Sequence, residues 1–238
     1  MLNTVSHPVF SKRMMYISLI ARNPPESPKL ESIIQTLKNF TRSTIFMAFL
    51  SKDHIREMVQ NAKLVEGYDD LEAQMTANGF DVRVGAVIEI LKAGKLAINK
   101  QDNKPPQLGT AWVVEGYEHR LQGYDIKEMI LCKPGFSVQL IPFQSYYTIT
   151  METINTPAAM LTKIASRTSL FRYTQTILEA GFGEAGYCGF LTFMLCPTLN
   201  GAELELGSRF AQVGFAQLTS ESHYQSQKES SYQGGKLF

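Results

Sequence analysis

The chain has 238 residues, of which 44% are hydrophobic and 19% charged, and its formal net charge at pH 7 is +1. This composition is typical of a globular protein and excludes an intrinsically disordered chain. So small a net charge gives no overall attraction to nucleic acid or to an anionic membrane, so any anion site must be local. No apolar run approaches the roughly 20 residues that a membrane-spanning helix needs. We therefore expect neither a nucleic-acid nor a membrane partner.

Three cysteines, Cys132, Cys188 and Cys196, lack CxxC or CxxH spacing. That pattern argues against a disulfide framework and against a zinc site. It suits a reducing compartment, so cytoplasmic localisation is expected. A basic pair precedes a short apolar run in "SKRMMYISLIARNPP", but no convincing cleavage site follows, so export is not expected.

Residues 1–46 differ from the rest, with a Pro- and Ser-rich stretch and six Lys or Arg against two Glu. Two readings stay open: a basic N-terminal extension that carries one helix, or a misassigned start upstream of Met47. After Met47, "LSKDHIREMVQNAKLV" predicts a helix, with Ser51 as an N-cap candidate and apolar residues at helical intervals.

Short β-branched or alternating segments fill most of the chain after this helix. They are separated by Gly, Pro and Asn and include "FDVRVGAVIEIL", "TAWVVEGYE", "SVQLIPFQSYYTITM", "AMLTKIAS", "YCGFLTFML", "AELELG" and "FAQVGFAQL". Seven or more such strands predict a mostly β domain over 47–218, closed or sandwiched and antiparallel. Residues 219–238 are polar and without periodicity, which predicts a flexible C-terminal tail.

The segment "RTSLFR" is a candidate phosphate site. Two guanidinium groups and two hydroxyls suit a multiply charged phosphate chain, and they belong to Arg167, Thr168, Ser169 and Arg172. The competing interpretation is a strand end followed by a helical turn with solvated arginines.

The segment "AGFGEAGYCG" contains four glycines in nine residues and predicts a tight hairpin. Glu184 at its tip is the candidate catalytic acid, because a carboxylate held near a phosphate can orient and deprotonate a water. Tyr187 is placed to cover a base or sugar. An ordinary glycine-rich hairpin with an exposed Glu is the alternative.

Three weaker candidates complete the set. Asp81 begins a strand in "NGFDVRVG", where it could hold magnesium or cap the strand through an Asx turn. Gln212 in "GSRFAQVGF" reads as a structural hydrogen-bond hub within a core strand. "SYQGG" offers an aromatic, an amide and two flexible glycines.

The order of these motifs from Met47 to Gly235 resembles the trimeric dUTPase and dCTP deaminase superfamily, especially its archaeal-type dUTPases. The resemblance rests on the helix and on five motifs, "NGFDVRVG", "RTSLFR", "FGEAGYCGFLTFM", "GSRFAQ" and "SYQGG". It implies a distorted antiparallel β-barrel of the dUTPase-like, β-clip type, assembled as a homotrimer with nucleotide sites at subunit interfaces.

The resemblance also implies roles for individual residues. The arginine–hydroxyl motif would bind the triphosphate, with Mg²⁺, while Tyr187 and Gly189 line the base pocket and Tyr232 and Gln233 form a lid. Gln212 is carried over as a further substrate-binding residue. The motif and the hairpin would come from different chains of the trimer.

Three departures from the family pattern bear on the reaction. The water-activating Asp of the dUTPases is Glu184 here, and the Glu of the deaminases is Met194, which cannot shuttle protons. The lysine before the terminal tyrosine is Ser231. We therefore expect a hydrolase that converts dUTP to dUMP and pyrophosphate. A dCTP deaminase, with an acid such as Glu179 as substitute, and a catalytically weak nucleotide sensor remain alternatives.

Overall fold

A computed structural model describes residues 48–227 and 232–238. The predicted extension at 1–46 lies outside the described residues, and everything below concerns the unit that begins at Met47. Within the described ranges, no helix is long and apolar enough to span a membrane.

The expected helix is α3 (Lys52–Ala62), which directly follows Ser51. Its apolar residues Ile55 and Val59 are buried, so the 3.6-residue period of the sequence becomes one core-facing stripe. The helix ends where Lys63 adopts a left-handed conformation and its N–H bonds the Met58 carbonyl.

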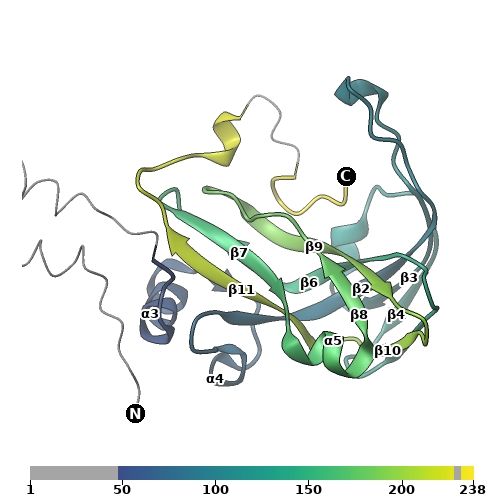
Figure 1. Cartoon of the computed structure of the whole chain (residues 1–238), viewed down its shortest axis with the longest axis horizontal. Helices are drawn as coiled ribbons and strands as arrows, with labels where there is room; N and C mark the ends of the chain where they lie inside the picture. The colour runs from purple at the N-terminus through teal and green to yellow at the C-terminus, as the bar shows by residue number, and fades with distance from the viewer. Residues whose placement is uncertain (1–47, 228–231) are drawn as a thin grey trace, which may run out of the picture. The chain divides into compact units, whose positions relative to one another are not determined.

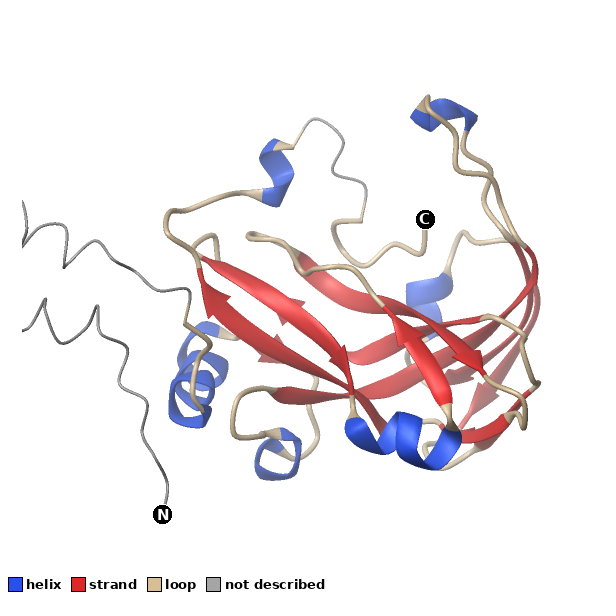
Figure 2. Ribbon diagram, viewed as in Figure 1, coloured by secondary structure: helices blue, strands red, loops and turns tan. Residues whose placement is uncertain are grey.

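The predicted mostly β fold is confirmed. Nine strands form one sheet whose main path runs β4-β3-β2-β6-β9-β8, with β1 on β6 and with β11 joining β2 to β7 (Figures 1 and 2). Their bounds are β1 (Val65–Glu66), β2 (Phe80–Lys92), β3 (Gln107–Val114), β4 (Ile126–Cys132), β6 (Tyr146–Asn155), β7 (Met160–Ser166), β8 (Thr176–Glu179), β9 (Cys188–Pro197) and β11 (Arg209–Gln217). A separate ribbon pairs β5 (Ser137–Leu140) with β10 (Ala202–Glu205).

The pairing is antiparallel except between β3 and β4, which run parallel. No ladder joins the end strands β4 and β8 in the described part of the chain, so the curved sheet resembles a barrel without closing. The long central strand β2 is buried over most of its length, since it pairs with β3, β6 and β11. The largest fully buried side chains include Tyr146, Phe80, Phe193, Phe210 and Phe215.

Several elements differ from the sequence prediction. The segment 137–151 is divided between β5 and β6, because Pro142 and the positive φ of Phe143 turn the chain. Strands β4 and β8 and helix α4 (Leu71–Gln74) were not predicted as elements, whereas α5 (Thr168–Thr174) is the helical turn that the competing interpretation of "RTSLFR" placed after a strand end.

Candidate functional site

The arginine–hydroxyl motif forms the start of α5, immediately after β7. Leu170 is buried and anchors this helix, and the Thr174 hydroxyl donates to the Leu170 carbonyl at 2.6 Å. The side chains of Thr168 and Arg172 are exposed. Ser169 is half-buried. The helix therefore presents one hydroxyl and one guanidinium of the motif to solvent.

Arg167 has a different environment. Its Nε lies 2.6 Å from Asp81 Oδ2, and its Nη1 donates to the Arg209 carbonyl at 3.3 Å. Arg209 adds a second guanidinium 3.6 Å from the same carboxylate oxygen. Arg167 thus ties α5 to β2 and β11, and only 31% of its side chain is exposed.

The sequence offered Asp81 either as a magnesium ligand or as an Asx-turn cap of its strand, and the structure pairs its carboxylate with two arginines. Its carboxylate is buried and already held by Arg167 and Arg209. Burial raises the pKa of Asp81, and the two guanidinium groups oppose that rise. Among the residues that the structure describes, no group of three or more His, Cys, Asp or Glu is arranged to hold a metal ion. The sequence could not reveal that two distant arginines would converge on this carboxylate.

The glycine-rich hairpin links β8 to β9, and Glu184 lies in its turn. Gly183 pairs with Thr162 of β7, and a Cβ at Gly183 would lie 2.7 Å from the Thr162 side chain. Gly186 has φ +79°, a conformation that favours glycine. Glu184 is half-buried, and its Oε2 accepts a 2.6 Å hydrogen bond from Gln227 Nε2. The acid therefore contacts the tail of its own chain through this one hydrogen bond.

Tyr187 lies in the core rather than on an open surface. Only 8% of it is exposed, its hydroxyl donates to the Phe190 carbonyl at 2.5 Å, and its ring packs edge-on against Tyr224. Burial raises the pKa of this phenol well above its usual value. In the single chain, the buried Tyr187 side chain stabilises the hairpin.

The residues predicted as lid lie directly beside those predicted to line the base pocket. The N–H of Gly234 donates to the Cys188 carbonyl at 2.8 Å, and Gly234 forms a bridge with Gly189. The Gln233 side-chain amide makes two hydrogen bonds with the hairpin backbone, donating to Gly186 O at 3.3 Å and accepting from Cys188 N at 3.4 Å. Tyr232 is 52% exposed.

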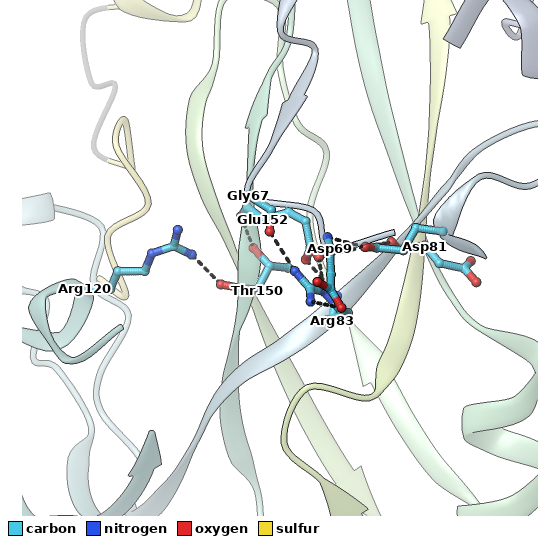
Figure 3. A network of polar contacts seen from close by, with 8 residues as sticks. Gly67, Asp69, Asp81, Arg83, Arg120, Thr150 and Glu152 are labelled. Atoms are coloured by element: carbon cyan, nitrogen blue, oxygen red, sulfur yellow. Dashed lines mark hydrogen bonds and ion pairs between the residues drawn. The ribbon is translucent and has the colours of Figure 1, made fainter. Parts of the chain in front are cut away.

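A cleft of about 730 Å³ lies alongside this junction and includes Gly189, Gly234 and Arg120 in its lining. The Arg120 guanidinium stacks between the rings of Tyr117 and Phe190, 4.8 and 5.1 Å from their centroids. Its Nη1 donates to the Thr150 carbonyl at 2.5 Å (Figure 3). Arg120 is a residue that the sequence reading did not select.

Gln212 lies on β11, where its amide nitrogen donates to the Thr76 hydroxyl. The contact joins β11 to the turn before β2, as expected if Gln212 has the structural hydrogen-bonding role. Gln212 also lines a smaller cleft with Lys163 and Asn78.

A buried polar network centred on Glu152 was missed by the sequence reading. Glu152 is fully buried, and its carboxylate accepts from Gln74 Nε2 at 2.8 Å, from the Arg83 N–H at 2.8 Å and from Arg83 Nε at 2.7 Å (Figure 3). Arg83 also donates to the Gly67 carbonyl. These contacts join β6 to β2 and to α4. The network's only sequence signal was an acid inside the apolar strand "YYTITMETIN".

Met194, at the position where the resemblance expects the deaminase acid, lies on β9 with Glu179 of β8 as its register partner. Tyr147 of β6 is its partner on the other side. Partners in register share a face of the sheet, so an exposed carboxylate stands next to the thioether.

The two halves of the predicted site lie apart within one chain. The hairpin is attached to β7 at Thr162, whereas Arg167 follows the other end of that strand (Figure 1). Thr162 and Arg167 are five positions apart along this extended strand, which corresponds to about 16 Å. One chain therefore does not bring Glu184 and α5 to the same phosphate group.

Comparison with known proteins agrees with the motifs. A "dCTP deaminase, dUMP-forming" from Dictyoglomus turgidum is 26% identical over 194 residues, which are 79% of this chain and 90% of the relative. A "probable deoxyuridine 5'-triphosphate nucleotidohydrolase" from Archaeoglobus fulgidus is 36% identical over 62 residues, 26% of this chain and 37% of the relative.

Among solved structures, the 2'-deoxycytidine 5'-triphosphate deaminase from Agrobacterium tumefaciens aligns with a TM-score of 0.49 and 18% identity. The alignment covers 72% of this chain and 48% of that one, so this chain spans about half the length of that enzyme. The sequence model of the dCTP deaminase-like family matches residues 49–218, most of the chain. The chain therefore belongs to the dCTP deaminase-like family.

Proposed function

We propose that the protein is a deoxynucleoside triphosphate hydrolase that converts dUTP and water to dUMP and pyrophosphate. The observation that supports this most directly is Glu184, a carboxylate held in the hairpin turn beside the predicted base and lid residues. The strand position expected to carry the deaminase acid holds Met194 instead. The chain thus retains an acid for water activation and lacks the expected acid for deamination.

In this mechanism Glu184 accepts a proton from a water molecule as the water oxygen bonds to the α-phosphorus. The bond between the α-phosphorus and the bridging oxygen breaks, and pyrophosphate leaves with that oxygen. The exposed hydroxyl and guanidinium of Thr168 and Arg172 stabilise the negative charge on the phosphates. Magnesium bound to the triphosphate would neutralise part of its charge, and no described residue is assigned as a direct ligand of the metal.

We further propose that the site is completed by a second copy of the chain within a homotrimer. The separation of about 16 Å along β7 supports an arrangement in which Glu184 of one copy acts with α5 of another. The surface around Arg172 supports such an interface, because Phe171, Tyr173 and Ile177 there are 50%, 88% and 52% exposed.

Deamination of dCTP is the second candidate, and the Glu179–Met194 register supports it. Glu179 is exposed on the strand face that Met194 occupies, so its carboxylate is the nearest substitute in register for the missing acid. The curated relative from Dictyoglomus turgidum bears the name of an enzyme that forms dUMP from dCTP.

The test is incubation of the purified protein with dUTP or dCTP and magnesium, with products separated by anion-exchange chromatography. We expect dUMP and pyrophosphate from dUTP, no uridine product from dCTP, and loss of turnover in Glu184→Gln. The control Glu203→Gln changes an exposed carboxylate on β10 and should keep full activity. A uridine nucleotide formed from dCTP and abolished by Glu179→Gln would establish the deaminase. Nucleotide binding without any product would establish the sensor.

A further inference from the structure

A second cleft lies on the outer face of β6 and β9. Its volume is about 530 Å³, and its lining includes Tyr147, Met194 and Tyr232. One further side is formed by the hairpin that connects β2 to β3, residues 93–106, here called the arm. Figure 1 shows the arm extending beyond the sheet on the side where the C-terminus lies. The cleft is therefore lined both by Tyr232, a predicted lid residue, and by the arm, which no sequence motif had indicated.

The arm makes this cleft cationic. Lys95, Lys100 and Lys104 line it, and no Asp or Glu is among its lining residues in the described part of the chain. The arm, residues 93–106, contains three Lys and one Asp, a balance of +2, whereas residues 47–238 contain 17 Lys or Arg and 20 Asp or Glu, a balance of −3. Positive charge is thus concentrated in one segment of an otherwise acidic unit, as a local anion site requires.

The backbone of the arm holds these lysines in place. Lys95 and Lys104 pair through two hydrogen bonds of 2.9 Å, each N–H donating to the other's carbonyl. The Ala97 N–H donates to the Asn103 side chain at 2.8 Å. Gly94 lies so close to the Lys104 carbonyl that a Cβ there would clash at 2.1 Å. Two ammonium groups therefore extend from facing positions of a fixed ribbon.

The remaining lining suits a planar ring. Tyr147 is half-buried and lies opposite Met194 in register, while Tyr232 and Phe238 are 52% and 40% exposed. Aromatic and thioether side chains offer the flat, polarisable surface against which a nucleobase packs. Cationic groups on one side and aromatic surface on the other match the two ends of a nucleotide.

We propose that the arm is a phosphate-binding element: its lysines hold the phosphates of the nucleotide whose base lies toward Tyr147 and Met194. The inference rests on the proposed function for the identity of the substrate. It adds a cationic contribution from the β2–β3 arm to that of α5, and it supplies positive charge near a lid that has Ser231 in place of a lysine. The lysines act by binding and positioning, with no part in proton transfer.

The test compares two matched double variants of the full-length protein. Lys95→Gln/Lys104→Gln removes two charges from the cleft, and Lys127→Gln/Lys133→Gln removes two exposed charges on or next to β4, outside it. Calorimetric titration with inorganic tripolyphosphate and with dUTP measures the dissociation constant, and turnover of dUTP gives KM and kcat. Far-ultraviolet circular dichroism checks that each variant is folded.

We expect the arm variant to bind both probes about tenfold more weakly, with a raised KM, a nearly unchanged kcat and a weaker dependence on salt. Lys95→Arg/Lys104→Arg should restore binding, and the β4 control should match wild type. Wild-type binding of both probes by the arm variant would overturn the inference and leave the hydrolase standing. Weaker binding of both probes by the arm variant, together with no dUTP turnover by the wild-type protein, would support the arm as a phosphate-binding element and overturn the hydrolase.

Discussion

The Arg167 guanidinium lies 2.6 Å from the buried Asp81 carboxylate, so the start of α5 and the start of β2 are joined by an ion pair. Both residues were predicted to contact substrate or metal. The charges of Arg167 and Asp81 therefore neutralise each other. Thr168 and Arg172 remain the members of the motif that are exposed to solvent. Arg167 then acts as a positioning residue that orients α5.

The first prediction concerns this pair. Asp81→Asn leaves two guanidinium groups beside a neutral amide, and we expect a loss of about 1–3 kcal/mol in the free energy of unfolding. Urea denaturation measures the loss, with Asp69→Asn, an exposed acid, as control. Magnesium-dependent turnover should persist in Asp81→Asn. Abolition of magnesium dependence without loss of stability would restore Asp81 as a metal ligand.

Glu152 gives the second prediction. Glu152→Gln removes the charge that neutralises Arg83, whose side chain is only 13% exposed, and should cost about 3–5 kcal/mol of unfolding free energy. Glu66→Gln is the matched control, because Glu66 pairs with Lys63 on the surface and should contribute less than about 1 kcal/mol. Equal effects of the two substitutions in a denaturant titration would show that the buried network is not a stabilising element.

The third prediction uses the raised pKa of Tyr187. Because the folded state holds this phenolic proton more tightly than the unfolded state, whose pKa is near 10.0, the stability it contributes is complete below that pH and declines as the pH rises above it. Tyr187→Phe should lose about 0.5–1.5 kcal/mol at neutral pH with its hydrogen bond.

The diagnostic result is the slope above pH 10, which should be shallower in Tyr187→Phe than in wild type. Urea unfolding at about pH 8 and about pH 10.5 measures it in both proteins. If the free energy of unfolding fell equally with pH in the two proteins, Tyr187 would not be the group responsible for the pH dependence.

The fourth prediction concerns the junction between the hairpin and the tail. A Cβ at Gly189 would lie 2.5 Å from the backbone nitrogen of Gly235, so Gly189→Ala should displace residues 232–238. Gly181→Ala is the control, since nothing lies within 4 Å of its added Cβ. Amide hydrogen exchange should speed up at Gly234, which donates to the Cys188 carbonyl, in the first variant alone. Unchanged exchange at Gly234 in Gly189→Ala would contradict this docking of the tail.

The sequence predicted those parts of the fold that local pattern determines. Alternation and β-branched residues indicated β2, β7, β9 and β11 nearly to their ends, and apolar spacing with Ser51 indicated α3. Short elements such as β8 were missed, because four residues carry too little periodicity to identify a strand.

Contacts between distant segments explain what the sequence could not predict in the site. Asp81 and Arg167 are 86 positions apart, and Glu152 and Arg83 are 69 apart. Nothing local to Asp81 distinguishes a metal ligand from a carboxylate held by arginines. The register that places Glu179 beside Met194 likewise depends on the pairing of β8 with β9.

The central claim is a hydrolytic site shared between copies, and complementation tests it most directly. Glu184→Gln and Arg172→Gln should each be inactive on dUTP alone. When the two are co-refolded in equal amounts, random assembly gives about one quarter of the sites an intact Glu184 from one copy and an intact Arg172 from another. We therefore expect about a quarter of wild-type turnover to return. If both groups acted within one chain, every site would carry one defect, and continued inactivity of the co-refolded oligomer would contradict the account.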